Sequence, residues 1–225
     1  MAEGLGTAFL LATVVGSGIM GERLANGLTG LALLANALAT GAVLAALILT
    51  LGPLSGAHFN PVVTLVSWRA SLLPRRDVPL YVGAQVCGAL LGVFVAHLMF
   101  AEPLLQASAH VRAGVGQLAG EFVATFGLVF LIAASQRSGL AATAAVVSLY
   151  ITSAYWFTSS TSFANPAVTL ARAFTDTFTG IRLVDVPAFG VAQLVGGFMS
   201  NAVWHWLVPP VALHRVASER RAAGE

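Results

Sequence analysis

The sequence predicts an all-α membrane protein with six transmembrane helices and two re-entrant half-helices in an inverted repeat. Two observations predict this fold. Of the 225 residues, 57% are hydrophobic and only 9% are charged, whereas a soluble domain carries about a quarter charged residues. In addition, a hexapeptide that begins with Asn60-Pro61 in the first half recurs in the second half, where it begins with Asn165-Pro166.

Six apolar segments are long enough to cross the hydrocarbon core, which takes about 20 helical residues. They are expected at residues 5–20, 28–51, 78–100, 115–134, 139–157 and 186–208. The first of them follows Met-Ala-Glu-Gly and no basic segment. We therefore expect it to be a membrane span and not a cleaved signal peptide.

Two shorter apolar segments, residues 61–70 and 166–174, are expected to form half-helices, each about 15 Å long at a rise of about 1.5 Å per residue. Asn is a favoured N-cap and Pro is well tolerated at the first helical position, so each Asn-Pro pair predicts a helix start. Half-helices that enter from opposite faces would bring their positive N-terminal ends together near the midplane.

Three landmarks recur in the same order in both halves. They are a glutamate early in the first span (Glu3 and Glu121), the Asn-Pro hexapeptide, and a Val-Pro pair followed by Gln and Gly (Val78, Gln85 and Gly88; Val186, Gln193 and Gly196). Three spans per repeat force the second half to insert upside down, and broken helices mark the functional site in such repeats. We expect one domain of residues 1–210, with repeats at about 1–105 and 115–210, and an Arg-rich tail at 211–225.

The arginines predict the orientation. With a cytoplasmic N-terminus, the outer loops hold Arg23, Arg112 and Arg182, and the cytoplasmic segments hold a larger set: Arg69, Arg75, Arg76, Arg137, Arg215, Arg220 and Arg221. Cytoplasmic loops carry the excess of basic residues. Both termini, including the tail, are therefore expected in the cytoplasm.

Several function classes are not supported. The sequence has no hydrolase elbow, phosphate loop, catalytic dyad or metal-binding cluster, so we expect neither an enzyme nor a cofactor nor a metal site. The single cysteine, Cys87, excludes an internal disulfide framework. A formal charge of +2 is too small to indicate nucleic acid as a partner.

The polar residues near the expected midplane are few. The side-chain oxygens of Asn60 and Asn165 are expected to cap their own helices, which leaves each amide NH₂ to donate into a lumen. Backbone that is not helical is tolerated at membrane depth only where it is buried or lines a cavity. The carbonyl groups of the segments before the asparagines are thus expected to line a pore: Gly56, Ala57, His58, Phe59, Ser162, Phe163 and Ala164.

Glu3 and Glu121 allow two interpretations. Carboxylates within a membrane are functional candidates by default, and a proton relay would make the protein a coupled transporter. Alternatively, each carboxylate accepts hydrogen bonds from the unwound loop of its repeat.

The segments Ser55–Val62 and Ala164–Ala167, which contain Pro61 and Pro166, resemble the twin signature loops of the aquaporin (major intrinsic protein) family. The resemblance covers the whole chain, although Val62 stands where the family usually has Ala. It implies a homotetramer of independent pores in membrane lipid, each conducting small neutral solutes passively, in a bacterial inner membrane. It also favours the loop-supporting interpretation of Glu3 and Glu121.

The family pattern implies a narrow filter on the outer side of the midplane, carried over by spacing to Thr40, Ser153, Ser162 and Val168. The family usually has an arginine where Val168 stands, and Arg172, one turn later, is not expected to replace it. The resulting ring is expected to be wide, uncharged and rich in hydroxyl groups, which suit a neutral polyhydroxyl solute. Trp156, Phe157 and Phe163 could narrow the outer vestibule.

The solute is the most open question. Loss of the arginine resembles a bacterial aquaporin subgroup associated with arsenic handling, so arsenous acid and other metalloid hydroxides rank first. Methylated arsenicals, glycerol, urea and water are further candidates. The alternatives are a channel mainly for water or glycerol and a gradient-coupled secondary transporter, which would share the inverted repeat but need coupling-ion sites.

Overall fold

Eight α-helices make up most of residues 1–208, the part of the chain that the computed structural model describes. They are α1 (Ala2–Leu24), α2 (Thr29–Ser55), α3 (Pro61–Arg69), α4 (Val78–Phe100), α5 (Val115–Ser135), α6 (Leu140–Phe157), α7 (Pro166–Ala171) and α8 (Val186–Leu207). Short 3₁₀ turns occur at η1 (Arg75–Asp77), η2 (Gln136–Ser138), η3 (Arg172–Phe174) and η4 (Leu183–Asp185). The expected tail at 211–225 lies outside the described residues.

Six of these helices are long and apolar enough to cross a membrane, which confirms the predicted all-α fold with six spans. The ends differ by a few residues. For example, α2 continues past Pro53 to Ser55 and ends where Gly56 takes a left-handed φ of 84°, a common helix terminator. The second half-helix is shorter than expected, because after Ala171 the chain tightens into the 3₁₀ turn η3.

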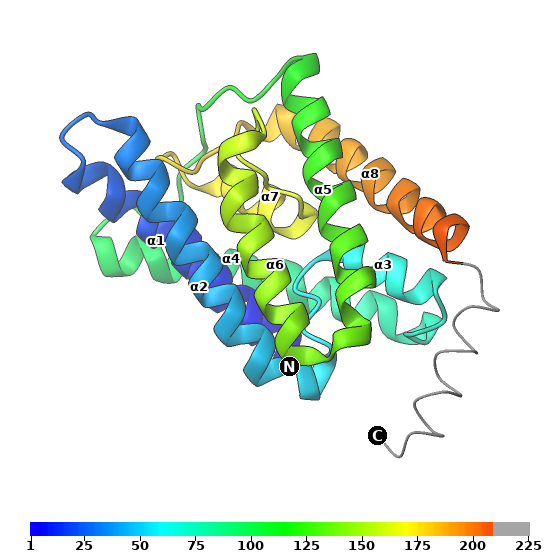
Figure 1. The fold of residues 1–225 in the computed structure, drawn as a ribbon. Coiled ribbons are helices and arrows are strands. Elements are labelled where there is room, and N and C mark those ends of the chain that lie inside the picture. The colour runs from blue at the N-terminus through cyan, green and yellow to red at the C-terminus, as the bar shows by residue number, and fades with distance from the viewer. Residues whose placement is uncertain (209–225) are drawn as a thin grey trace.

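The two halves of the chain use the same packing pattern. Helix α1 packs against α2 and α4, and α5 packs against α6 and α8 in the same way. Figure 1 shows α1 and α2 on one side of the bundle and α5 and α8 on the other. Each half-helix packs against the last long helix of the opposite half, α3 against α8 and α7 against α4. The halves are therefore interlocked at the half-helices.

The order of the spans defines two ends of the bundle. Helix α1 begins, and α8 ends, at one end, which we call the N-terminal face; the opposite end is the distal face. Because α3 begins in the interior and leads to α4, it runs towards the N-terminal face. Helix α7 also begins in the interior but runs towards the distal face.

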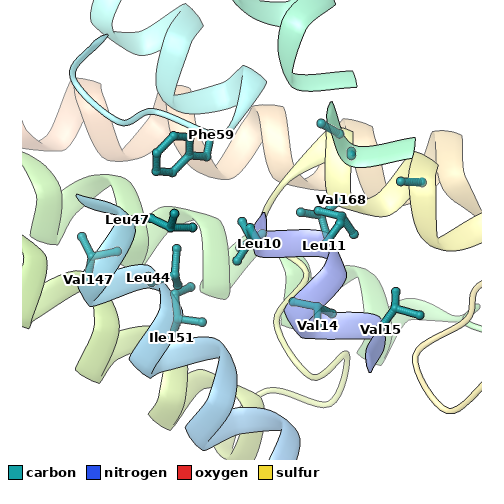
Figure 2. Close-up of a cluster of buried hydrophobic side chains, with 14 of the residues drawn as sticks. Leu10, Leu11, Val14, Val15, Leu44, Leu47, Phe59, Val147, Ile151 and Val168 are labelled. Carbon is teal, nitrogen blue, oxygen red and sulfur yellow. The ribbon is translucent and has the colours of Figure 1, made fainter. Parts of the chain in front are cut away.

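Buried apolar side chains from both halves of the chain form one large cluster. Figure 2 shows them in two groups, one from α2 and α6 and the other from α1 and α7. Leu44 and Ile151 belong to the first group, and Leu10, Val14 and Val168 to the second. All five also line the cavity described below. The apolar cluster is thus both the core of the bundle and one wall of a cavity.

Candidate functional site

The two asparagines tie the half-helices together. The side-chain nitrogen of Asn60 donates to the backbone oxygen of Ala164 at 2.7 Å, and that of Asn165 donates to the backbone oxygen of Phe59 at 2.7 Å. An amide NH₂ carries two donors, so one N–H of each asparagine is used in this link. The expectation that the whole NH₂ group is available to the lumen is therefore wrong for one of its two N–H groups.

The side-chain oxygens of the same asparagines cap the half-helices. Asn60 accepts the backbone N–H of Val62 at 2.9 Å, and Asn165 accepts those of Ala167 and Val168 at 3.0 and 3.3 Å. Pro61 and Pro166 follow at the first helical position, where the missing N–H is not needed. This is the cap geometry that the Asn-Pro sequence predicts.

A buried glutamate holds each loop. Glu3 accepts hydrogen bonds from both backbone N–H groups that precede Asn60, and Glu121 accepts them from both that precede Asn165, at 2.7–3.0 Å. Glu3 is 3% exposed and Glu121 is fully buried. These carboxylates accept hydrogen bonds from loop donors that would otherwise be unpaired. Each buried unpaired donor would cost about 1–3 kcal/mol.

A glutamine and a threonine extend each network. Gln85 donates to Glu3 at 2.7 Å and to the hydroxyl of Thr64 at 2.9 Å. In the second half, Gln193 donates to Glu121 at 2.5 Å and to the hydroxyl of Thr169 at 2.8 Å. Each threonine hydroxyl in turn donates to the backbone oxygen of the asparagine in its own loop.

The loops before the asparagines contain left-handed residues at matching positions. They are Gly56, Ala57 and Phe59 in the first loop and Thr161, Ser162 and Ala164 in the second, with φ between 47° and 84°. For residues other than glycine this conformation costs about 1–3 kcal/mol each and is kept only where the surroundings enforce it. The glutamate and asparagine hydrogen bonds provide that enforcement.

A cavity of about 530 Å³ lies between the half-helices. Asn60 and Asn165 both line it, as do the loop residues expected from the sequence: Gly56, Ala57, His58, Phe59, Ser162, Phe163 and Ala164. On the side of the N-terminal face its lining includes Tyr81 and Gly139, near the starts of α4 and α6. The lining residues from α1, α2, α5 and α6 are mostly apolar, with Thr40 and Tyr155 among the exceptions.

The expected filter residues do not all lie together. Thr40, Ser162 and Val168 line the cavity, but Ser153 is exposed on the outside of α6, where its hydroxyl donates to the backbone oxygen of Tyr150. The expectation for Ser153 is therefore wrong. Tyr155, two residues later, takes its place on the cavity wall, and its hydroxyl lies 3.2 Å from that of Thr40.

Arg172 also lines the cavity, so one charged side chain belongs to its lining, although the filter ring was expected to be uncharged. The side chain is 2% exposed, and its guanidinium carbon lies 3.3 Å from the centre of the Phe163 ring. Its Nε donates to the backbone oxygen of Thr179. The 3₁₀ turn η3 begins at this residue.

A second arginine reaches the same ring from the segment between α4 and α5. The guanidinium of Arg112 lies 4.9 Å from the centre of the Phe163 ring and donates to the backbone oxygens of Gly180 and Ser160. Burial lowers the pKa of Arg112 below the ordinary arginine value, and the Glu121 carboxylate opposes this shift. Nothing in the local sequence of this loop signals that Arg112 belongs to the site.

Val62 contacts Gly197 on α8, a long helix of the other half. A Cβ added to Gly197 of α8 would overlap Cγ1 of Val62, which is fully buried. The equivalent positions in the other half are Ala167 and Ala89, both buried alanines. Here a larger residue in the signature loop is matched by the loss of a side chain on the neighbouring helix.

Six apolar spans, two half-helices that meet in the interior, and a cavity between them define a membrane channel. The Major intrinsic protein family matches residues 1–158. Aquaglyceroporin AqpS of Rhizobium meliloti (strain 1021) is 54% identical over 210 residues, which are 93% of this chain and 90% of that protein. The chain therefore belongs to the major intrinsic protein family, whose members are membrane channels and not enzymes.

A further relative and a solved structure are also similar to this chain. Nodulin-26 of Glycine max is 36% identical over 136 residues, which are 59% of this chain and 48% of that protein. The crystal structure of the aquaglyceroporin from Plasmodium falciparum has the same fold, with a TM-score of 0.74 and 21% identity over 94% of this chain and 96% of that one.

Proposed function

We propose that the protein is a passive channel for small neutral hydroxylated molecules, with arsenous acid as the first candidate and glycerol, urea and water as further solutes. The observation that carries this proposal is the cavity that Asn60 and Asn165 both line. The half-helix loops offer backbone and side-chain hydrogen-bonding groups to it, and the lining residues of the long helices are mostly apolar. A solute with hydroxyl groups and a carbon or metalloid centre can use both kinds of lining.

The side chains proposed for the filter favour a solute larger than water. We propose Thr40, Tyr155, Ser162 and Val168 as the selectivity filter, with Tyr155 in the place first assigned to Ser153. Val168 contributes no donor and little bulk, while hydroxyl groups act as both donors and acceptors. The name of the relative AqpS, an aquaglyceroporin, agrees with this solute class.

The glutamates support the choice of a channel over a coupled transporter. All four carboxylate oxygens of Glu3 and Glu121 accept hydrogen bonds. Four of the donors are backbone N–H groups, those of His58, Phe59, Phe163 and Ala164. A coupling site needs a carboxylate that is open to the transported ion. These carboxylates instead hold the loops in place.

We further propose a homotetramer in a bacterial inner membrane with both termini in the cytoplasm. Arg69, Arg75, Arg76 and Arg137 belong to the N-terminal face, and the tail arginines lie outside the described residues. In the described loops these four arginines exceed by one the three at the distal face, Arg23, Arg112 and Arg182, and this excess fits the positive-inside rule. Mass measurement of the detergent-solubilised protein tests the tetramer, and labelling of an engineered terminal tag in intact cells tests the orientation.

The test is a flux assay in proteoliposomes with arsenous acid, glycerol and water as separate solutes. Val168→Arg adds bulk and charge to the filter, and we expect it to lower the two larger fluxes about tenfold or more while water flux falls less. Val168→Leu is the matched control for bulk without charge. Saturable uptake that follows a proton gradient, or equal loss of all three fluxes in Val168→Arg, would contradict the proposal.

A further inference from the structure

Arg172 is a buried cation near the filter. The position after Asn165-Pro166-Ala167, where the family usually has an arginine, holds Val168 instead. The Nε of Arg172 is bound to the backbone oxygen of Thr179, and its two terminal nitrogens have no hydrogen-bond partner among residues 1–208. The same side chain lines the cavity and stacks on Phe163. The terminal N–H groups are therefore the part of the guanidinium that a molecule in the cavity can reach.

No carboxylate of residues 1–208 forms an ion pair with this charge. The ion pairs of the described residues join other groups, and Arg172 and Arg112 take part in none of them. Arg112 contacts the same phenylalanine ring and adds a second positive charge nearby. An unpaired charge buried at membrane depth is costly and is retained where function requires it.

Ser162 supplies a further polar group at the same place. Its side chain is 3% exposed and lines the cavity, and its hydroxyl has no hydrogen-bond partner among the described residues. Ser162 immediately precedes Phe163, on whose ring Arg172 stacks. A buried hydroxyl and a guanidinium with unused donors thus both line one cavity, and the residue next to the hydroxyl, Phe163, carries the stacked guanidinium.

We propose that Arg172 performs the function of the filter arginine that is missing at Val168, from a position one helical turn further along the chain. Its terminal N–H groups, together with the Ser162 hydroxyl, bind an oxygen of a neutral hydroxylated solute, and its charge excludes cations and protons. This inference rests on the channel function proposed above. The side chain of Arg172 would then determine the selectivity of the cavity, and the Phe163 ring and the backbone of Thr179 hold it in place.

The test compares proton and potassium leak with glycerol and water flux in proteoliposomes. Arg172→Met keeps most of the side-chain length but removes charge and donors. We expect its proton and potassium leak to rise about tenfold or more, because the charge that lines the cavity is lost and Arg112, which remains, does not line it. Arg23→Met is the matched control, since Arg23 belongs to the same end of the bundle but does not line the cavity. Its leak should equal that of the native protein.

The double variant Val168→Arg/Arg172→Met moves the cation back to the position that follows Asn165-Pro166-Ala167. We expect it to restore low leak relative to Arg172→Met alone. If Arg172→Met folds, conducts glycerol and leaks no more than the native protein, the inference is wrong. If the native protein conducts neither glycerol nor arsenous acid, the proposed channel function is wrong. The leak of Arg172→Met relative to the native protein still tests the cation exclusion separately.

Two milder variants decide the question if Arg172→Met does not fold. Arg172→Lys keeps the charge without the planar stack, so it should exclude cations normally but lower the ratio of glycerol flux to water flux. Ser162→Ala removes a hydroxyl that has no hydrogen-bond partner among residues 1–208, so folding should be unaffected and the same ratio should fall a few-fold. An unchanged flux ratio in both variants would overturn the solute subsite.

Discussion

The loop before Asn60 and the loop before Asn165 carry the same hydrogen-bond network but differ in the side chain two residues before the asparagine. In the first loop this side chain is His58, whose ring lies 3.1 Å from the Thr64 hydroxyl and packs against Tyr81. In the second loop it is Phe163, which packs against two guanidinium groups.

A second difference concerns the half-helices. Helix α3 has nine residues and α7 only six before the 3₁₀ turn. The first signature loop carries Val62 against Gly197, and the second carries Ala167. The shared residues build the scaffold that holds both loops, whereas the differing residues give each end of the cavity its own chemistry. The variants below separate these two contributions.

The largest effect is expected from the shared scaffold. Glu121→Gln and Glu3→Gln each remove a charge that accepts backbone N–H groups and leave at least one donor badly paired, which should lower the free energy of unfolding by about 3 kcal/mol. The Glu121 variant should lose more, because Glu121 is fully buried and Glu3 lies in the first turn of α1. Thermal unfolding in detergent measures both, and a larger loss for Glu3→Gln would contradict this ranking.

An intermediate effect is expected where the two halves differ in packing. Gly197→Ala places a methyl group against Val62 and should destabilise the protein by about 1–3 kcal/mol. In a Val62→Ala background the same substitution should cost much less, because the methyl group then occupies vacated space. A double-mutant cycle on unfolding free energies checks this. Additive costs would mean that the two side chains do not compete for the same volume.

The smallest effect on stability is expected at the cavity wall of α6. Tyr155→Phe removes the hydroxyl that faces Thr40, and the ratio of glycerol flux to water flux should change while stability falls by about 1 kcal/mol. Ser153→Ala, on the exposed side of the same helix, should change stability by less than about 0.5 kcal/mol and leave the fluxes unaltered. A changed flux ratio in Ser153→Ala would restore Ser153 as a candidate filter residue.

Much of this organisation could be predicted from local sequence. Asn60-Pro61 and Asn165-Pro166 predict helix starts because the cap and the proline act within one helical turn. The apolar segments predict six spans because hydrogen bonding in lipid allows little else. Glu3 and Glu121 are recognisable because a carboxylate within an apolar span needs a partner.

The filter was less predictable because it depends on rotation and on distant contacts. At about 3.6 residues per turn, an error of two residues turns a side chain by about 200°, which is the difference between Ser153 on the outside and Tyr155 on the cavity wall. The sequence does not predict a filter role for Arg172, because a regular helix would carry its side chain away from Val168. The structure instead holds it against Phe163 and Thr179, contacts that no local pattern specifies.

The reciprocal bonds between the asparagines and the opposite loops have a consequence for how the chain folds. They join residues 104 and 106 positions apart, and each loop accepts from the other. During synthesis the first loop therefore emerges with its Phe59 carbonyl unpartnered and stays so until the second half has entered the membrane. Contacts of such long sequence separation form late, so the centre of the protein should be the last part to become ordered, after all six spans are in place.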